Sequence, residues 1–361
     1  MKKEKTQITK QLMQWYESHA RILPWRTDSR RGEKADPYRV WISEIMLQQT
    51  RVEAVKEYFQ RFMLHLPDVK SLAEVPEDEL MKLWQGLGYY NRARNLQKAA
   101  KQIMDQYNGR FPEKYEILLQ LPGIGEYTAG AIASIAFDER VPAVDGNVYR
   151  IYTRLMKEDG DITKAAVKRR IRDNLQEMMP QDGAGAFNQA WMDLGSAVCL
   201  PTGMPLCAQC PLQEQCKACH SGDMLSYPVK PDKKKRKKEQ RTILLLEYQG
   251  KYLLQKRPPR GLLAGLWEFP SQEGYVSVEQ MQEQLKAWQT VGSQIELLGK
   301  GQHIFSHIEW HMLGYLIHLE KAPELMLPAE SVWVDPEEME RRYSIPSAFR
   351  CYYDQIMHLQ Q

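Results

Sequence analysis

The sequence predicts a multidomain protein in which an all-α domain at residues 1–226 precedes an α+β domain at 242–361. Glycine and proline turns separate helical apolar patterns throughout the first part. A segment at 227–241 with two prolines and a run of basic residues has the composition of a linker. After it, short apolar runs on either side of a Gln-Gly turn are typical of strands. With 361 residues in total, each domain is long enough to bury a core of its own.

The charge is unevenly distributed along the chain. The formal net charge is +3, but residues 230–241 alone carry +6, which leaves −3 for the rest. Nucleic-acid binding outside this basic segment would therefore depend on local patches and backbone amides. No stretch of 18 apolar residues is present, so we expect no membrane-spanning segment. The first residues lack the apolar run of a secretion signal, so we expect no export.

The first two helices are predicted at 7–23 and 37–62, the second one beginning at an Asp-Pro pair. Within it, Glu44 lies between Val40 and Leu47 in an apolar stripe. Burial without a charged partner raises the pKa of a carboxyl group, which suits a proton donor near neutral pH. The alternative is a structural glutamate that reaches the surface or caps a loop.

A glycine turn at 83–94 opens another helix. It carries two tyrosines that we expect to be exposed, Tyr89 and Tyr90, followed by Arg92 and Arg94. Aromatic rings among arginines suit stacking on bases together with contacts to phosphate. The alternative is a pair of tyrosines packed in a helix corner.

The most informative turn is Leu-Pro-Gly-Ile-Gly at 121–125. Pro122 fixes φ, and Gly123 and Gly125 permit positive φ and close approach of the backbone. Because a helix of small residues follows, the turn amides and the helix N-terminus would form an anion site, most simply for a nucleic-acid phosphate. An ordinary corner between two helices is the alternative.

A carboxylate follows this turn at a distance of 20 residues, at Asp145. A carboxylate close to an anion-binding hairpin could face positive charge that develops on a sugar beside the phosphate. The alternative is the N-cap of the next helix, and one residue can do both.

Residues 121–150 resemble the helix–hairpin–helix DNA glycosylases. In the lyase branch of that superfamily the second residue after Gly-x-Gly is a nucleophilic lysine, and here that position is Tyr127. A tyrosine cannot form a Schiff base. The resemblance therefore implies a glycosylase that removes a base without lysine-dependent strand cleavage.

The segment Ile42 to Thr50 resembles a signature of the adenine-specific mismatch glycosylases, the MutY family. The resemblance implies that Glu44 is the catalytic acid. It also implies that Asp145 stabilises an oxocarbenium ion or adds to it transiently, with support from Tyr127 and Asn147. It also implies that Gln49 and Tyr89 act as wedges in the base stack. DNA contacts are expected from Arg26, Gln49, Tyr89, Gly123, Gly125, Gln189, Phe305, Ser306 and His307.

Two interpretations of Gln189 are possible. From the sequence alone, a glutamine on this predicted helix could read an adenine edge with two hydrogen bonds. A buried glutamine bonded to the backbone is the alternative. The MutY resemblance favours the contact with adenine.

Five of the six cysteines lie between Cys199 and Cys219, which indicates metal binding more than disulfides. Four thiolates at 199–216 can enclose a cube-like cluster, with zinc as the rival. The last two gaps match the [4Fe–4S] loop of the glycosylase superfamily, whereas the first gap has seven residues where that family has six. The ligands are assigned as Cys199, Cys207, Cys210 and Cys216, with Cys219 left open as an alternative to Cys216.

The C-terminal part begins with a predicted hairpin of strands at 242–248 and 251–257. The following segment, 261–270, resembles the start of a Nudix-like fold. The next predicted helix lacks the Arg-Glu-x-x-Glu-Glu pattern that holds the hydrolase metal, so the resemblance extends to the fold alone. In the MutY family such a domain reads the oxidised guanine through a Phe-Ser-His loop, here 305–307. Without the family, these three residues would be read as a strand end.

The sequence thus predicts a DNA-repair enzyme that hydrolyses the N-glycosidic bond of adenine mispaired with 8-oxoguanine or guanine. Its partner would be double-stranded DNA, its cofactor a [4Fe–4S] cluster, and its state a monomer in the cytoplasm, associated with the nucleoid. Two alternatives remain: a bifunctional glycosylase/lyase for oxidised pyrimidines, and a non-catalytic DNA-binding or nucleotide-sanitising protein built on the Nudix-like domain.

Overall fold

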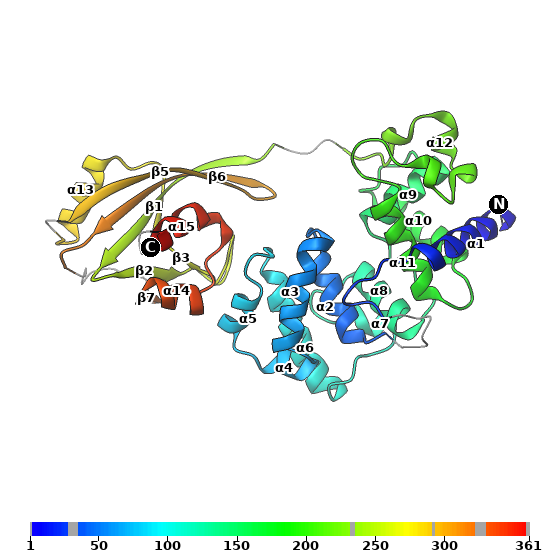
Figure 1. Cartoon of the computed structure of the whole chain (residues 1–361), viewed down its shortest axis with the longest axis horizontal. Coiled ribbons are helices and arrows are strands. Elements are labelled where there is room, and N and C mark those ends of the chain that lie inside the picture. The colour runs from blue at the N-terminus through cyan, green and yellow to red at the C-terminus, as the bar shows by residue number, and fades with distance from the viewer. Residues whose placement is uncertain (1, 28–34, 232–234, 291–292, 322–329, 359–361) are drawn as a thin grey trace. The chain divides into compact units, whose positions relative to one another are not determined.

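The structure is a computed structural model, and its chain divides into two compact units (Figure 1). Unit 1 consists of Met1–Glu74 and Arg94–Asp232, and unit 2 of Val75–Ala93 and Lys233–Gln361. The residues described are 2–27, 35–231, 235–290, 293–321 and 330–358. Residues 28–34, which lie between the first two predicted helices, and the linker residues 232–234 lie outside the described residues. No described helix is both long and apolar enough to cross a membrane.

Unit 1 is helical in its described residues. Its helices are α1 (Lys2–His19), α2 (Pro37–Leu47), α3 (Val52–His65), α4 (Val69–Glu74), α7 (Tyr115–Leu118), α8 (Glu126–Phe137), α9 (Gly146–Met156), α10 (Ala165–Met178), α11 (Ala184–Ala197) and α12 (Lys217–Ser221). Helix α6 (Asn91–Tyr107) begins in unit 2 and continues into unit 1. The helix predicted over 7–23 therefore starts earlier and ends earlier, and Ile22 beyond it is exposed.

The single helix predicted over 37–62 is wrong, because the structure has two helices there. Gln48 ends α2, and Gln49 has a φ of 60°, a left-handed conformation that cannot continue a right-handed helix. Arg51 then precedes α3 in an extended conformation. The break brings the polar residues 48–50 to the wall of the pocket described below.

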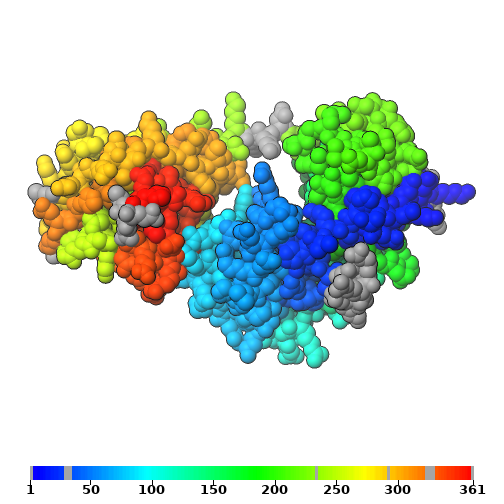
Figure 2. All heavy atoms as spheres, viewed as in Figure 1, coloured from blue at the N-terminus to red at the C-terminus, as the bar shows by residue number. Residues whose placement is uncertain are grey.

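Helix α1 packs on α10 and α11. In the space-filling view, the dark blue N-terminal segment lies against green segments of the same unit (Figure 2). Its residues Ile8, Leu12 and Tyr16 belong to one core cluster with apolar residues of α9, α10 and α11. Helix α8 packs on α2 and α11 and approaches the chain before α9 closely. A Cβ atom on Gly130 would lie 2.8 Å from the carbonyl oxygen of Pro142. The small residues of α8 thus bring the segment that leads to Asp145 near α2.

Unit 2 contains a mixed sheet with the strand order β3-β2-β1-β6-β5. Its strands are β1 (Lys237–Tyr248), β2 (Lys251–Lys256), β3 (Trp267–Glu268), β4 (Ser271–Glu273), β5 (Gln294–Ile304), β6 (Ile308–His318) and β7 (Ser331–Val334). Its helices are α5 (Glu77–Leu83), α13 (Val278–Ala287), α14 (Pro336–Arg342) and α15 (Arg350–His358). Strand β1 runs parallel to β6 and antiparallel to β2. The predicted hairpin is confirmed, with Tyr248 paired to Lys251.

Two boundaries differ from those expected. Strand β1 begins at Lys237, so the last five residues of the segment read as a linker form part of the sheet. The segment 75–93 lies within the range assigned to the helical domain but groups with unit 2. Within that unit, Lys82 donates to the carbonyl of Tyr343 at 3.2 Å, and Gln85 to that of Ile345 at 3.1 Å. Pairing between residues so far apart in the chain gives no local sequence signal.

Candidate active site

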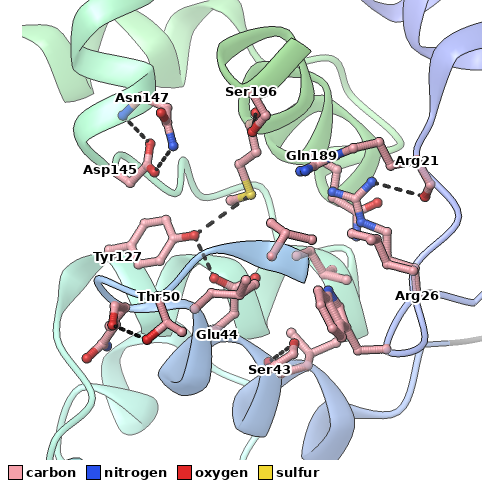
Figure 3. Close-up of a pocket in the computed structure, with 18 of the residues that line it drawn as sticks. Arg21, Arg26, Ser43, Glu44, Thr50, Tyr127, Asp145, Asn147, Gln189 and Ser196 are labelled. Atoms are coloured by element: carbon pink, nitrogen blue, oxygen red, sulfur yellow. Dashed lines mark hydrogen bonds between the residues drawn. The ribbon is translucent and has the colours of Figure 1, made fainter. Parts of the chain in front are cut away.

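A pocket of about 510 Å³ lies within unit 1, between α2, the chain before it, α8, the start of α9 and α11 (Figure 3). A pocket of this size suits a small ligand. It collects all the predicted catalytic residues and several predicted DNA contacts: Arg26, Glu44, Gln49, Tyr127, Asp145, Asn147 and Gln189. Residues separated by up to 163 positions in the chain therefore line one pocket.

Glu44 is buried on α2, as its place in the apolar stripe predicts, with 6% of its surface exposed. The Tyr127 hydroxyl donates to its Oε2 at 2.6 Å. Burial raises the pKa of Glu44 to about 7, although the Tyr127 hydrogen bond and the Arg26 charge act against this shift. A carboxylic acid with this pKa can hold and release a proton near neutral pH.

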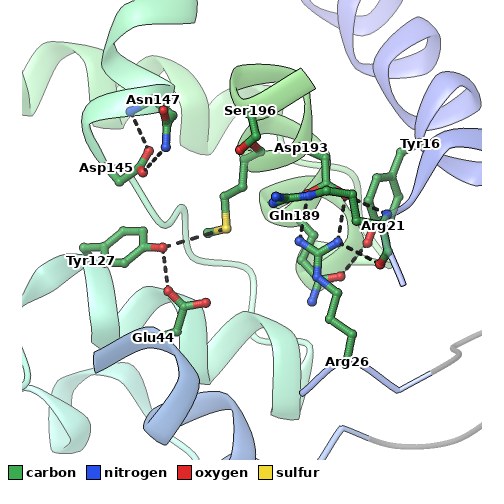
Figure 4. A network of polar contacts seen from close by, with 11 residues as sticks. Tyr16, Arg21, Arg26, Glu44, Tyr127, Asp145, Asn147, Gln189, Asp193 and Ser196 are labelled. Carbon is green, nitrogen blue, oxygen red and sulfur yellow. Dashed lines mark hydrogen bonds and ion pairs between the residues drawn. The ribbon is translucent and has the colours of Figure 1, made fainter. Parts of the chain in front are cut away.

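Tyr127 lies on α8 between Glu44 and Asp145 (Figure 4). Burial raises the pKa of its hydroxyl well above the usual value, so the group stays protonated and donates to Glu44. The second carboxyl oxygen of Glu44 is turned away from Tyr127. The position that holds a lysine in the lyase branch is thus occupied by a hydrogen-bond donor to the candidate acid.

Asp145 caps the N-terminus of α9, which confirms the N-cap interpretation, and it also lines the pocket. Its Oδ1 accepts from the backbone amides of Asn147 at 2.9 Å and Val148 at 2.8 Å, and its Oδ2 from Nδ2 of Asn147 at 2.7 Å. These bonds fix the position of the Asp145 carboxyl group at the N-terminus of α9.

Asn147 is held in turn by Arg150, which the sequence analysis did not identify. Its Nη2 donates to Oδ1 of Asn147 at 3.0 Å and to the carbonyl of Gly195 at 2.8 Å, and its Nε to the carbonyl of Cys199 at 2.9 Å. Arg150 is 7% exposed. Only its position one turn after Asp145 on a helix could have drawn attention to it.

A buried ion cluster forms the opposite side of the pocket. Asp193 is fully buried on α11 and accepts from Arg26 Nη1 at 2.7 Å and Nη2 at 2.9 Å. It also accepts from Arg21 Nε at 2.7 Å. Burial acts to raise the pKa of Asp193, but the two arginines outweigh it and hold this pKa below its usual range. Arg26, predicted as a DNA contact, is thus fixed inside the pocket by an aspartate that the sequence analysis missed.

The predicted wedges share an unusual backbone. Gln49 at the pocket and Tyr89 in unit 2 have φ of 60° and 47°. Side chains rarely occupy this region, and such strain often marks functional sites. Tyr89 is 50% exposed, whereas Tyr90 is buried, so the expectation of two exposed tyrosines is wrong for Tyr90.

The residues Phe305, Ser306 and His307 form the tight loop between β5 and β6 in unit 2. The ring of Phe305 packs edge-on against the ring of Trp310, with 4.9 Å between the two ring centroids, and this contact anchors the loop. Ser306 and His307 are exposed, and Oγ of Ser306 lies 2.7 Å from the hydroxyl of Tyr89 in the same unit. The loop thus presents two polar side chains beside a predicted wedge.

The hairpin between α7 and α8 contains Gly123 and Gly125. Gly123 has a φ of +77°, and a Cβ atom there would lie 2.6 Å from Cβ of Asn95, so a glycine is required. Gly125 is the N-cap of α8 and offers no capping side chain. The first-turn amides of α8 are therefore not occupied by a cap at this position.

A second cavity is lined by Cys199, Cys207, Cys210, Cys216 and Cys219. All five are free thiols, and Nη1 of Arg154 lies 3.3 Å from Sγ of Cys199. Among the described residues, no three His, Cys, Asp or Glu side chains are grouped as ligands of one metal ion. The iron–sulfur cluster therefore stays a prediction.

The raised pKa of Glu44 makes stability depend on pH. The folded protein binds this proton more tightly than the unfolded chain, so the contribution is complete below about pH 4.5 and is lost as the pH rises through about 7. The stability lost between low pH and pH 8 amounts to about 3 kcal/mol. We expect Glu44→Gln to raise the free energy of unfolding, relative to wild type, more at pH 8 than at pH 5, as measured by urea denaturation. The exposed Glu53→Gln is the control, and an equal difference at both pH values would contradict the shift.

Comparisons with known proteins agree with this arrangement. Residues 42–177 match the family described as HhH-GPD superfamily base excision DNA repair protein, and residues 241–355 match the NUDIX domain. Adenine DNA glycosylase of Mus musculus is 34% identical over 97% of this chain and 78% of its own length. Adenine DNA glycosylase of Buchnera aphidicola subsp. Schizaphis graminum is 32% identical over 85% of this chain and 86% of its own.

Solved structures are similar to the helical part. A thermostable thymine-DNA glycosylase superposes with a TM-score of 0.54 at 25% identity, over 61% of this chain and 98% of its own. Endonuclease III in a non-covalent DNA complex superposes with a TM-score of 0.52 at 24% identity, over 62% of this chain and 98% of its own. This similarity shows a shared fold. The predicted fold class and family resemblance are confirmed. The chain belongs to the adenine DNA glycosylases, base-excision enzymes of the HhH-GPD superfamily with a Nudix-like C-terminal domain.

Proposed function

We propose that this glycosylase removes adenine mispaired with 8-oxoguanine or guanine in double-stranded DNA, with Glu44 as general acid and Asp145 as the stabiliser of the sugar cation. One observation carries the catalytic part: a buried carboxyl group with a pKa of about 7 and a hydrogen-bonded carboxylate line the same pocket. Two carboxyl groups in different environments are the usual basis of glycosidic hydrolysis.

The adenine has to leave the base stack to reach this pocket, which costs a few kcal/mol. Gln49 and Tyr89 would fill the space that it leaves and offset part of this cost. Their strained backbone and, for Tyr89, the exposed ring support this role. In the pocket, Arg26 and Gln189 line the side opposite Asp145 and would contact the base.

Protonation of adenine then makes it a better leaving group. Because Tyr127 donates to Oε2 of Glu44, the proton of the acid is available on Oε1, which is turned away from Tyr127. As the bond to the base breaks, positive charge develops on the sugar, and the fixed carboxylate of Asp145 would stabilise it. Asn147 holds Asp145 and would also help to position the attacking water.

The strand is expected to stay intact. A lyase step needs an amine nucleophile, and Tyr127 occupies the corresponding position with its hydroxyl bonded to Glu44. This supports a monofunctional enzyme over the glycosylase/lyase alternative. The duplex would be held through the α7–α8 hairpin at Gly123 and Gly125, where the first turn of α8 can accept a phosphate.

The base opposite the adenine would be read by residues 305–307 in unit 2. Support comes from the exposed side chains of Ser306 and His307 and from the 2.7 Å contact of Ser306 with Tyr89. A hydroxyl group can both donate and accept, which suits the edge of an oxidised guanine. We expect the protein to act as a monomer in the cytoplasm, in association with the nucleoid.

The cysteine loop would hold a [4Fe–4S] cluster through Cys199, Cys207, Cys210 and Cys216. The fit rests on the thiols that line one largely apolar cavity and on the guanidinium of Arg154, which lies beside Cys199. When bound, such a cluster would stabilise the loop and its charge distribution. The base-release chemistry described above does not pass through it.

Cys219 lines the same cavity, so substituting Cys216 and Cys219 one at a time identifies which of them is the fourth ligand. We expect Cys216→Ser to lower the iron content and the visible absorbance of the purified protein, because it removes a ligand. Cys219→Ser is the matched control and should retain both. The reverse pattern would assign Cys219 in place of Cys216.

The test of the proposed function is single-turnover base release from duplexes with adenine opposite 8-oxoguanine, guanine or thymine. Rapid release opposite 8-oxoguanine, slower release opposite guanine and none opposite thymine are expected. Ser306→Ala should reduce the preference for 8-oxoguanine over guanine and leave the guanine rate close to wild type. Equal wild-type rates opposite 8-oxoguanine and guanine would contradict the reading role of the loop, and release opposite thymine would contradict mispair specificity.

A further inference from the structure

A hydrogen bond between Tyr16 and Gln189 links the core to the pocket (Figure 4). Tyr16 is on α1, is 8% exposed and belongs to the core cluster of unit 1. Its hydroxyl donates to Oε1 of Gln189 on α11 at 2.5 Å. Gln189 lines the pocket, whereas Tyr16 does not. The expectation that Gln189, if structural, bonds to the backbone is therefore wrong.

This bond fixes which end of the amide faces the pocket. A buried hydroxyl group needs an acceptor for its proton. The nearby carboxylate of Asp193 already accepts from Arg21 and Arg26. Among the residues that the structure describes, Oε1 of Gln189 is the acceptor found for Tyr16. Turning the amide over would leave the hydroxyl proton without it, so the oxygen stays toward Tyr16 and the nitrogen on the other side (Figure 4).

An amide that is held in one orientation presents its NH₂ donor and its oxygen acceptor to the base at fixed places. Adenine has an amino donor at position 6 beside a ring-nitrogen acceptor, at N1 or at N7. The NH₂ of Gln189 can donate to that acceptor, and Oε1 has a second lone pair that can accept from the amino group. A 6-oxopurine such as hypoxanthine has an acceptor at position 6 and a proton on N1. On this N1 edge it would match the amide only in the opposite orientation, whereas its N7 edge carries two acceptors and matches neither orientation.

We infer that Tyr16 is a positioning residue that fixes the donor–acceptor order of Gln189 and thereby makes the pocket select 6-aminopurines over 6-oxopurines. The inference rests on the proposed function, because it requires the target base to enter this pocket. Tyr16 does not touch the base, and its effect on specificity passes entirely through Gln189.

The experiment compares single-turnover release from two duplexes that differ only in the target base, adenine or hypoxanthine. Tyr16→Phe keeps the buried ring and removes the hydroxyl, so the amide of Gln189 can turn over. We expect the adenine-to-hypoxanthine rate ratio to fall by about tenfold. Tyr152→Phe is the matched control, because Tyr152 is 4% exposed in the same core cluster and does not line the pocket. It should leave the ratio unchanged.

A second background separates positioning from a merely structural role. In Gln189→Glu the two oxygens of the carboxylate are equivalent, so no order remains for Tyr16 to fix. Adding Tyr16→Phe to this variant should leave the ratio unchanged. An unchanged ratio for Tyr16→Phe alone, or an equal loss of rate in both backgrounds, would overturn the inference while adenine release by the wild type stands. Absence of adenine release by the wild type would overturn the proposed function as well.

Discussion

Glu44→Gln is expected to lower single-turnover release of adenine opposite 8-oxoguanine by ~10²–10⁴-fold. Gln keeps the size of the side chain and can accept the hydrogen bond from Tyr127, so the pocket should keep its shape. It cannot donate an acidic proton to the leaving base. Because the pKa of Glu44 is about 7, the wild-type rate should fall as the pH rises through about 7, and the residual rate of the variant should lose this dependence.

The control for this variant is Glu53→Gln, which removes an exposed glutamate on α3. Its rate should be that of the wild type. Binding of Glu44→Gln to the mispaired duplex, measured by equilibrium titration, should stay close to wild type, because the acid acts on the bond that breaks. Near-normal turnover by Glu44→Gln would remove Glu44 from the acid role, and loss of binding would indicate a structural role instead.

The burial of Glu44 was predictable because its cause is local. The apolar residues four positions before it and three after it lie on the same face of a helix, and that periodicity is visible in the sequence. The end of the helix three residues later was not predictable. Gln49 carries no turn signal of its own, so its left-handed backbone could not be read from the local sequence pattern.

The other side of the pocket was missed for a different reason. Asp193 contacts Arg21 and Arg26 across more than 160 positions of sequence, and Tyr16 contacts Gln189 across 173. An aspartate on a mostly apolar helix gives no indication of which distant cation will neutralise it. Such pairs become visible once α1 and α11 are packed together. The sequence therefore predicted the residues proposed for chemistry, but not those that hold the pocket in place.

The hairpin of the Nudix-like unit was predictable from the Gln-Gly turn. The lack of the metal-binding helix pattern limited the prediction to the Nudix-like fold, and the absence of hydrolase activity stays a prediction. The parallel pairing of β1 with β6 could not be read from the sequence, because a register between distant strands has no local signal. That pairing nevertheless fixes the end of β6 beside which Ser306 and His307 lie.

Asp145→Asn is expected to lower adenine release by ~10²–10³-fold while the melting temperature stays close to that of the wild type. Asparagine caps a helix about as well as aspartate does, so the bonds to the amides of Asn147 and Val148 can persist. The negative charge that would face the sugar cation is lost. Asp145→Ala should lose the cap as well as the charge, so its free energy of unfolding should fall by about 1 kcal/mol in addition to the loss of rate.

The two variants together decide what Asp145 contributes. Both variants are measured by single-turnover release and by thermal unfolding of the same samples. If Asp145→Asn is slow but as stable as the wild type, the negative charge of Asp145 accounts for the lost rate. If Asp145→Asn kept the wild-type rate and only Asp145→Ala lost rate and stability together, the aspartate would be a helix cap and no more. The carboxylate then could not be the group that stabilises the sugar, and the proposed mechanism would need another anion in a pocket whose remaining described carboxylate, Glu44, is already assigned to the leaving base.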